Sequence, residues 1–144
     1  MNLPDIVEAI KVRLEDVDGV RPYAYQLDTI PAGQGDVVMV TPAPTLIDYQ
    51  QALKGGLAYV NLTLLVFIQM TDPRSAYLRL YELASSGTGE SRSLIDALMI
   101  GDRTFGGVQG DVVVDDLSNV RGEQFDGGRY LTAEIGVRVL VGRL

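Results

Sequence analysis

The chain has 144 residues, of which 12 are basic and 19 acidic, so its net charge is −7, and it contains neither cysteine nor histidine. This composition excludes disulfides, thiolate metal sites and a histidine general base, and the acidic balance is opposite to the usual footprint of nucleic-acid binding. The length predicts a single domain over residues 1–144. Because no apolar run is long enough to cross a bilayer and the first residues interleave charges with apolar side chains, we expect a soluble intracellular protein.

The first half of the chain predicts one helix followed by three strands. Apolar residues recur at helical spacing over residues 3–14, which favours an amphipathic helix. A short strand is expected at 20–27, where Pro22 indicates the edge of a sheet. A second strand follows at 36–42, and the longest extended stretch, rich in β-branched residues, runs over 57–70.

The second half predicts two helices followed by two strands. Asp72 is a good N-cap, Pro73 suits the first helical position, and Gly87 can end the helix. The buried stripe expected for this helix consists of Ala76, Tyr77, Leu80, Leu83 and Ala84. A shorter helix is predicted within 91–101, then a strand at 110–116 and the closing strand after the turn "FDGG".

The closing strand alternates cleanly between an apolar and a polar face. Its apolar positions are predicted to enter the core. The polar row on the opposite face consists of Tyr130, Thr132, Glu134 and Arg138. Glu134 and Arg138 are about 13 Å apart along a strand, too far for direct contact. We therefore expect each of them to meet a cross-strand or an intersubunit partner.

The order of the elements predicts the fold class. A helix, three strands, two helices and two strands come in blocks, which favours an α+β fold with a mainly antiparallel sheet of four to five strands. The helices are expected to pack on one face of this sheet, and the other face is expected to be partly polar.

The segment 42–57 does not fit a tight hairpin, because it is too long and too apolar. Its apolar side chains are Leu46, Ile47, Tyr49 and Leu53. One interpretation is a short helix that is capped by Thr45, ends at Gly55 and folds back on the core. The other is a projecting arm that covers its apolar residues against a neighbouring subunit. The sequence leaves both open.

The sequence predicts no catalytic, cofactor or metal site. "SGTGES" at 86–91 lacks the lysine and the preceding buried strand of a phosphate-binding loop. The aspartates between 111 and 126 do not have the spacing of a calcium loop. No nucleophile stands in a motif with a base. We therefore expect a protein that is not an enzyme.

Several stretches resemble one family over nearly the whole chain. They are "IDY" at 47–49, "GG" at 55–56, "TDPRSAYLRLYELASSGTGESRSLIDAL" at 71–98, "RTFGGV" at 103–108 and "GGRYLTAEIGVRVLV" at 127–141. In these the chain resembles the tail terminator proteins of long-tailed, siphovirus-type bacteriophages, especially phages of actinobacteria. The pair of helices at 71–98 is the strongest part of the resemblance, and it consists of scaffold features rather than a catalytic signature.

The resemblance implies a structural virion protein. Such proteins close into a ring, typically a homohexamer, that caps the tail tube, stops tail polymerisation and offers a surface to the head connector. The implied partners are other copies of the chain, the tail tube protein and a head-side connector protein, with no cofactor, no membrane and no sequence-specific nucleic acid. The implied location is the tail or neck of the virion, after assembly in the host cytoplasm.

A ring needs a contact between two different patches on neighbouring copies. We place the expected subunit or tail-tube contacts in the apolar segment and in the polar row, at Leu46, Ile47, Tyr49, Leu53, Tyr130, Thr132, Glu134 and Arg138. Two alternatives remain open. One is another head–tail connector or neck (head completion) ring protein, and the other is a small non-phage enzyme or ligand-binding domain.

Overall fold

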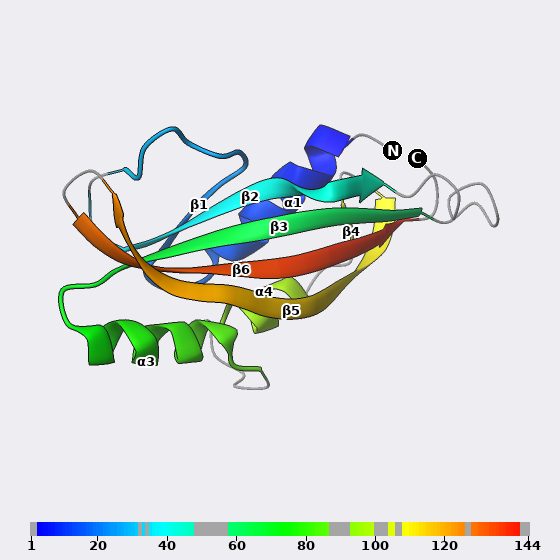
Figure 1. Ribbon diagram of the computed structural model, residues 1–144. Helices are drawn as coiled ribbons and strands as arrows, with labels where there is room; N and C mark the ends of the chain where they lie inside the picture. Colours follow the sequence, from blue (N-terminus) through cyan, green and yellow to red (C-terminus); the bar gives the residue numbers. More distant parts are fainter. Residues whose placement is uncertain are drawn as a thin grey trace.

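The computed structural model describes residues 3–31, 33, 35–47, 58–86, 93–99, 104–105, 108–125 and 128–141. In this part of the chain three helices accompany one mixed, mostly antiparallel sheet (Figure 1). The helices are α1 (Leu3–Glu15), α3 (Pro73–Ala84) and α4 (Leu94–Met99). The strands are β1 (Val20–Tyr23), β2 (Asp36–Ile47), β3 (Ala58–Gln69), β4 (Thr104–Phe105), β5 (Val108–Phe125) and β6 (Gly128–Val141).

The predicted α+β fold class is confirmed. Five strands lie side by side in the order β1-β2-β3-β6-β5, and the two-residue β4 follows beside β5. Only β1 and β2 run parallel; the other pairs in the described sheet are antiparallel. Figure 1 looks onto the sheet face opposite the helices, so that α1 and α4 pass behind the strands.

The centre of the sheet is the pairing of β3 with β6, which runs along the whole of β3. From Val60 to Ile68 and from Leu131 to Val139, every second side chain points to the helices and is at most 3% exposed. These side chains are Val60, Leu62, Leu64, Val66, Ile68, Leu131, Ala133, Ile135, Val137 and Val139. The apolar face predicted for the closing strand is therefore confirmed as core from Leu131 to Val139, and β3 shares this core.

The three helices close the core from one side. Their fully or almost fully buried side chains are Ile6, Ile10 and Leu14 of α1, Ala76, Leu80 and Leu83 of α3, and Leu94 and Leu98 of α4. Each large aliphatic side chain buried in this way contributes about 1.5–3 kcal/mol. The helix layer and the two central strands thus hold one continuous hydrophobic core.

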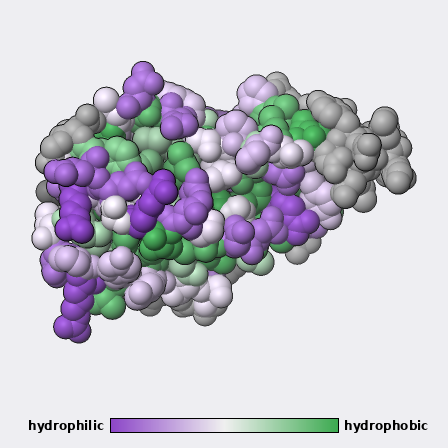
Figure 2. Space-filling view, in the orientation of Figure 1, coloured by the Kyte–Doolittle hydropathy of each residue, from purple (hydrophilic) through white to green (hydrophobic). Residues whose placement is uncertain are grey.

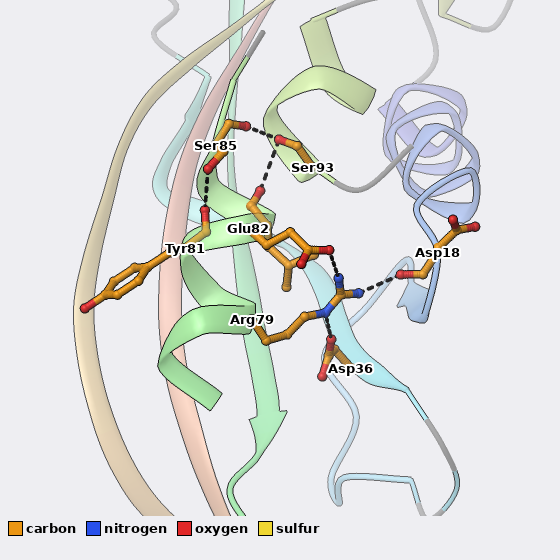
Figure 3. A network of polar contacts seen from close by, with 8 residues as sticks. Asp18, Asp36, Arg79, Tyr81, Glu82, Ser85 and Ser93 are labelled. Carbon is orange, nitrogen blue, oxygen red and sulfur yellow. Dashed lines mark hydrogen bonds and ion pairs between the residues drawn. The ribbon is translucent and has the colours of Figure 1, made fainter. Parts of the chain in front are cut away.

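Arg79 of α3 ties three segments together at one end of the sheet (Figure 3). Its Nε donates to Oδ2 of Asp36 at the start of β2, at 2.7 Å, and its Nη2 donates to the carbonyl oxygen of Asp18, at 2.6 Å. Its Nη1 also reaches Oε1 of Glu82, at 2.9 Å. The turn between α1 and β1 passes directly beneath the guanidinium, because Gly19 adopts a φ of 76° there. A β-carbon at this glycine would lie 3.2 Å from Nη2 of Arg79.

Ser93 caps α4 and fastens it to the end of α3 (Figure 3). Its hydroxyl oxygen accepts from the backbone N–H groups of Ile95 and Asp96, at 3.1 and 3.3 Å. The same hydroxyl lies against the carbonyl oxygens of Ser85 and Leu83. Because Ser93 is only 1% exposed, this capping serine is part of the core as well as a helix start.

Three expectations from the sequence differ from the fold. The first strand ends at Tyr23, and the second continues to Ile47, so a helix capped by Thr45 is wrong. The strand expected at 110–116 extends to Phe125. The alternating strand pattern in the sequence is shorter than the observed strand in both β2 and β5. Prolines interrupt it in β2, and polar residues dominate in β5.

Tyr77 and Ala84 were also expected to be buried, but Tyr77 is 37% exposed and Ala84 is half-buried. The buried line of α3 is Ala76, Leu80 and Leu83. Tyr77 lies about 100° further round the helix than Ala76, because α-helices have 3.6 residues per turn. The contact of α3 with the core is narrower than the apolar pattern predicts.

Beyond the end of β1, no described strand pairs with the outer edge of β2, and a proline stands on this edge. The N–H of Asp36 donates to the carbonyl oxygen of Gly19, so the backbone of the even-numbered residues points to the β1 side. Pro42 is still in register with β3 and is the first even-numbered residue of β2 after Val40. Because proline has no N–H, no unpaired donor is exposed at this position.

We predict that Arg79→Met lowers the free energy of unfolding by about 2 kcal/mol, because it leaves the mostly buried carboxylate of Asp36 without its cation. Urea unfolding followed by circular dichroism measures this change. Lys11→Met is the matched control: among the described residues Lys11 pairs with Glu8 and Glu15 on its own helix, so its loss should leave the free energy of unfolding nearly unchanged. Equal effects of the two variants would contradict the tertiary role of Arg79.

Candidate interaction surfaces

The polar row of β6 lies on the sheet face opposite the helices, and its side chains are half-buried. Figure 2 shows this face, where hydrophilic side chains over β5 and β6 alternate with hydrophobic ones. β6 is an inner strand between β3 and β5, so each residue of the row has a neighbour on both sides. The row is therefore part of a continuous surface of side chains.

Arg138 meets a partner on β5. Its Nε and Nη2 lie 2.9 Å from the carboxylate oxygens of Asp115. Its guanidinium carbon also stands 5.1 Å from the centre of the Tyr59 ring on β3. The side chains of Arg138 and Asp115 remain 40% and 37% exposed. The expected cross-strand partner of Arg138 thus exists within the chain.

Glu134 also has a cross-strand partner, Asn119, whose side-chain amide donates to it. Asn119 has a φ of 54°, the left-handed conformation that asparagine tolerates better than most residues. It stands where the register of β5 against β6 slips by one residue, between Ser118 and Arg121. This β-bulge turns the amide toward Glu134.

A second slip of one residue lies between Val114 and Asp116 and leaves Asp115 as the extra residue. Gly136 stands opposite this bulge, and a β-carbon there would lie 2.7 Å from Oδ1 of Asp116. The glycine interrupts the polar row of β6 so that the bulged strand can approach closely. The two bulges together supply both partners of the charged residues of the row.

The start of the row is aromatic. Tyr130 packs against Phe125 with ring centres 6.2 Å apart, and Phe125 meets Phe67 edge-on at 5.9 Å. Thr132 donates from Oγ1 to the carbonyl oxygen of Arg121, at 3.2 Å. Such aromatic and hydroxyl contacts across neighbouring strands stabilise a sheet by a few tenths of a kcal/mol to about 1 kcal/mol each.

A groove of about 290 Å³ crosses this face next to the row. Its floor is formed by Met39, Leu65 and Phe67, and Thr132 and Glu134 also line it. One wall is the segment 26–30, which leaves the sheet after β1; the other is the bulged end of β5. The groove combines an apolar floor with charged walls.

The predicted arm at 42–57 is described only in part. Its residues up to Ile47 belong to β2, where Leu46 and Ile47 are half-buried against the core. Leu46 also lines an apolar cavity of about 260 Å³ between β2 and the first turn of α1. Tyr49 and Leu53 lie outside the described residues, so the arm itself stays a prediction.

The outer face of α3 is an apolar surface that the sequence analysis missed. Leu78 and Tyr81 are 55% and 60% exposed, and Tyr77 stands beside Tyr81 with ring centres 6.3 Å apart. Tyr81 follows Leu78 by three residues and Tyr77 by four, so both lie next to it on the surface of the helix. The sequence could have indicated this surface, because α3 carries a second apolar stripe besides the one that is buried.

The described residues offer little reactive chemistry. No three histidine, cysteine, aspartate or glutamate side chains among them gather closely enough to hold a metal ion.

A hydrogen bond to Glu15 and the charge of Glu8 raise the pKa of Lys11, which lies on α1. None of the helices in the described part of the chain is long and apolar enough to span a membrane.

Comparison with known proteins adds no assignment: no protein-family model matches the chain, and a search among curated proteins finds no match.

We predict that Arg138 and Asp115 are coupled by about 0.5–1 kcal/mol, as is typical of a partly exposed ion pair with good geometry. A double-mutant cycle with Arg138→Met and Asp115→Asn, measured by urea unfolding at low salt, gives this coupling. It should shrink at high salt, because exposed charges are screened. A coupling of zero at both salt concentrations would mean that Arg138 does not use Asp115 in solution.

Proposed function

We propose that this protein is a tail terminator of a long-tailed bacteriophage, a structural subunit that closes into a ring on the end of the tail tube. In this role the ring stops tube polymerisation and presents a surface to the head-side connector. The ring is a homohexamer, and its partners besides other copies of the chain are the tail tube protein and the connector protein. It needs no cofactor and performs no catalysis.

The observation that carries this proposal is the exposed apolar face of α3. It lies within residues 71–98, the stretch in which the chain most strongly resembles tail terminators. A monomer gains nothing from two tyrosines and a leucine exposed together on one helix, whereas a subunit of a ring covers such residues against its neighbour. The resemblance and the exposed surface, which share this stretch of the chain, both support self-association.

The charge of the chain fits a ring through which DNA passes. A net charge of −7 gives little basis for phosphate binding, which depends on lysine and arginine. DNA could therefore move through such a ring without being held.

Another head–tail connector ring would share the self-association but bind on the other side of the junction. The two roles differ in what the ring binds: a terminator binds tail tube, and a head-side connector binds portal-side proteins. An assay with tail tubes therefore separates them directly.

The purified protein should bind one end of tubes assembled from the tail tube protein encoded in the same genome, and it should stop their growth. Electron microscopy of tubes grown with and without the protein measures tube length and shows whether a ring sits at the end. Light scattering should give a mass of about 94 kDa, six times the subunit mass of 15.6 kDa, at high concentration or in the presence of tubes.

Tubes of unchanged length without end-bound rings would contradict the terminator role. Binding to portal-side proteins instead would assign the protein to the head-side connector. The arm is tested in the same assay by Tyr49→Ser with Leu53→Ser, which is expected to weaken capping. Leu46 and Ile47 are unsuitable for that test, because they pack against the core and their replacement would also destabilise the fold.

A further inference from the structure

The groove beside the polar row has an apolar floor and a wall that rests on it. The floor consists of Met39 of β2 and of Leu65 and Phe67 of β3. The segment 26–30 forms one wall, and the N–H of Leu27 in this segment donates to Sδ of Met39, at 3.5 Å. Figure 1 shows the chain after β1 looping out from the sheet near the start of β6. The wall and the floor are therefore parts of one folded surface.

The charged side chains that line this groove are mostly acidic. They are Asp28, Glu123, Glu134 and Arg121. Arg121 forms an ion pair with Glu123, so these two charges balance each other. The carboxylates of Asp28, on the segment 26–30, and of Glu134, on β6, remain.

Neither of these two carboxylates has a cation as its partner within the described part of the chain. Glu134 accepts from the side-chain amide of Asn119, which is neutral, and it is half-buried. Asp28 is exposed, and no described side chain forms an ion pair or a hydrogen bond with it. Two charges of one sign in a concave site with apolar walls focus the electric field and attract an opposite charge. The groove therefore favours a positively charged occupant.

The apolar floor restricts what this cation can be. A bare metal ion would leave the floor in water, and the acidic side chains in the described residues do not gather closely enough to hold one. An arginine side chain meets both requirements. Its aliphatic stem can lie on apolar surface, and its planar guanidinium stacks on aromatic rings such as Phe67 and Phe125 and binds carboxylates. Lysine lacks the planar group and matches this lining less well.

The size and the place of the groove fit a side chain of a partner protein. Its volume of about 290 Å³ lies at the lower limit of small-molecule sites, which begin at about 300 Å³. Figure 2 shows hydrophilic side chains beside hydrophobic surface on this face of the sheet, the mixture that is usual at the rim of a protein interface. A protein lying on this face would cover the side chain that it places in the groove.

We propose that the groove binds an arginine side chain of a protein partner, with the stem on the apolar floor and the guanidinium beside the carboxylates of Asp28 and Glu134. Arginines that enter a pocket in this way are frequent anchors of protein interfaces. This inference goes beyond the proposed function and does not depend on it. It states the chemistry that a partner must present to this face of the sheet.

The test is a titration of the full, isotopically labelled chain, followed by NMR, with two peptides that differ in one group. Acetyl-Gly-Gly-Arg-Gly-Gly-amide carries the guanidinium, and the matched peptide carries citrulline, a neutral urea of the same shape. The arginine peptide should shift the backbone signals of Leu27, Phe67 and Thr132. Its dissociation constant at low salt should be at least about 5-fold lower than that of the citrulline peptide. This difference should shrink at high salt, because charges at the surface are screened.

Two variants of the chain test the carboxylates. Asp28→Asn and Glu134→Gln each remove one charge and keep the size of the side chain, and glutamine retains an oxygen that can accept from Asn119. Each should weaken binding of the arginine peptide at least about 3-fold and leave the citrulline peptide unaffected. Asp16→Asn, at an exposed position outside the groove, is the matched control and should bind as the wild type does. Circular dichroism checks that all three variants are folded.

Equal binding of the two peptides, or unchanged binding in both carboxylate variants, would overturn this proposal. Benzamidine, a small aromatic cation, is the third probe. If benzamidine shifts the signals of the groove and the arginine peptide does not, the groove is a site for small cations and the contact with a protein side chain is wrong. The terminator role is decided separately by the tube assay, so each of the two ideas can fail without the other.

Discussion

The pairing of β3 with β6 is the constraint on which the rest of the structure depends. Both strands carry apolar side chains at every second position along most of their length, and the observed register points both sets to the helices. A slip by one residue would turn one strand's apolar set to the open face and bring its polar residues into the core. The register of this pair determines which face of the sheet the helices cover, which face is polar and where the outer strands add to the sheet.

Within the described part of the chain the helices cover one side of the sheet, and the polar row lies on the other side. β5 supplies the partners of the row's charged residues. Glu134 and Arg138 lie over a sheet with many apolar neighbours, where unpaired charges would be costly. The two bulges of β5 bring Asn119 and Asp115 to them. Arg138 is thereby balanced by an opposite charge, whereas Glu134 has a neutral partner and keeps its charge beside the groove.

The exposed apolar side chains and the strand edges that could bind a partner are unevenly distributed over the molecule. Along the described strands, the free edge of β2 has a proline and β5 is bulged, whereas exposed apolar side chains gather on α3 and around the cavity beside α1. Strand edges pair with almost any other strand, whereas large apolar side chains that enter a pocket of a partner are recognised by shape. A subunit that must close into one ring and not aggregate would need this division.

The sequence by itself determined the element order, the α+β class and the core face of β6, because alternation along a strand and helix-start residues such as Asp72 and Pro73 are local properties. The side chain of Asp72 makes no capping hydrogen bond in the structure, although the helix begins where the residue predicts. The sequence also identified the polar row as an uncovered face. Only the tertiary structure decided that Tyr77 faces outward, that β2 runs on past Pro42, and which residues pair with Glu134 and Arg138. The position of Tyr77 depends on how much of a helix the core can cover, which a second apolar stripe on one helix only hints at. The other two depend on where a sheet ends and on register slips between distant residues, and these leave no periodic trace in the sequence.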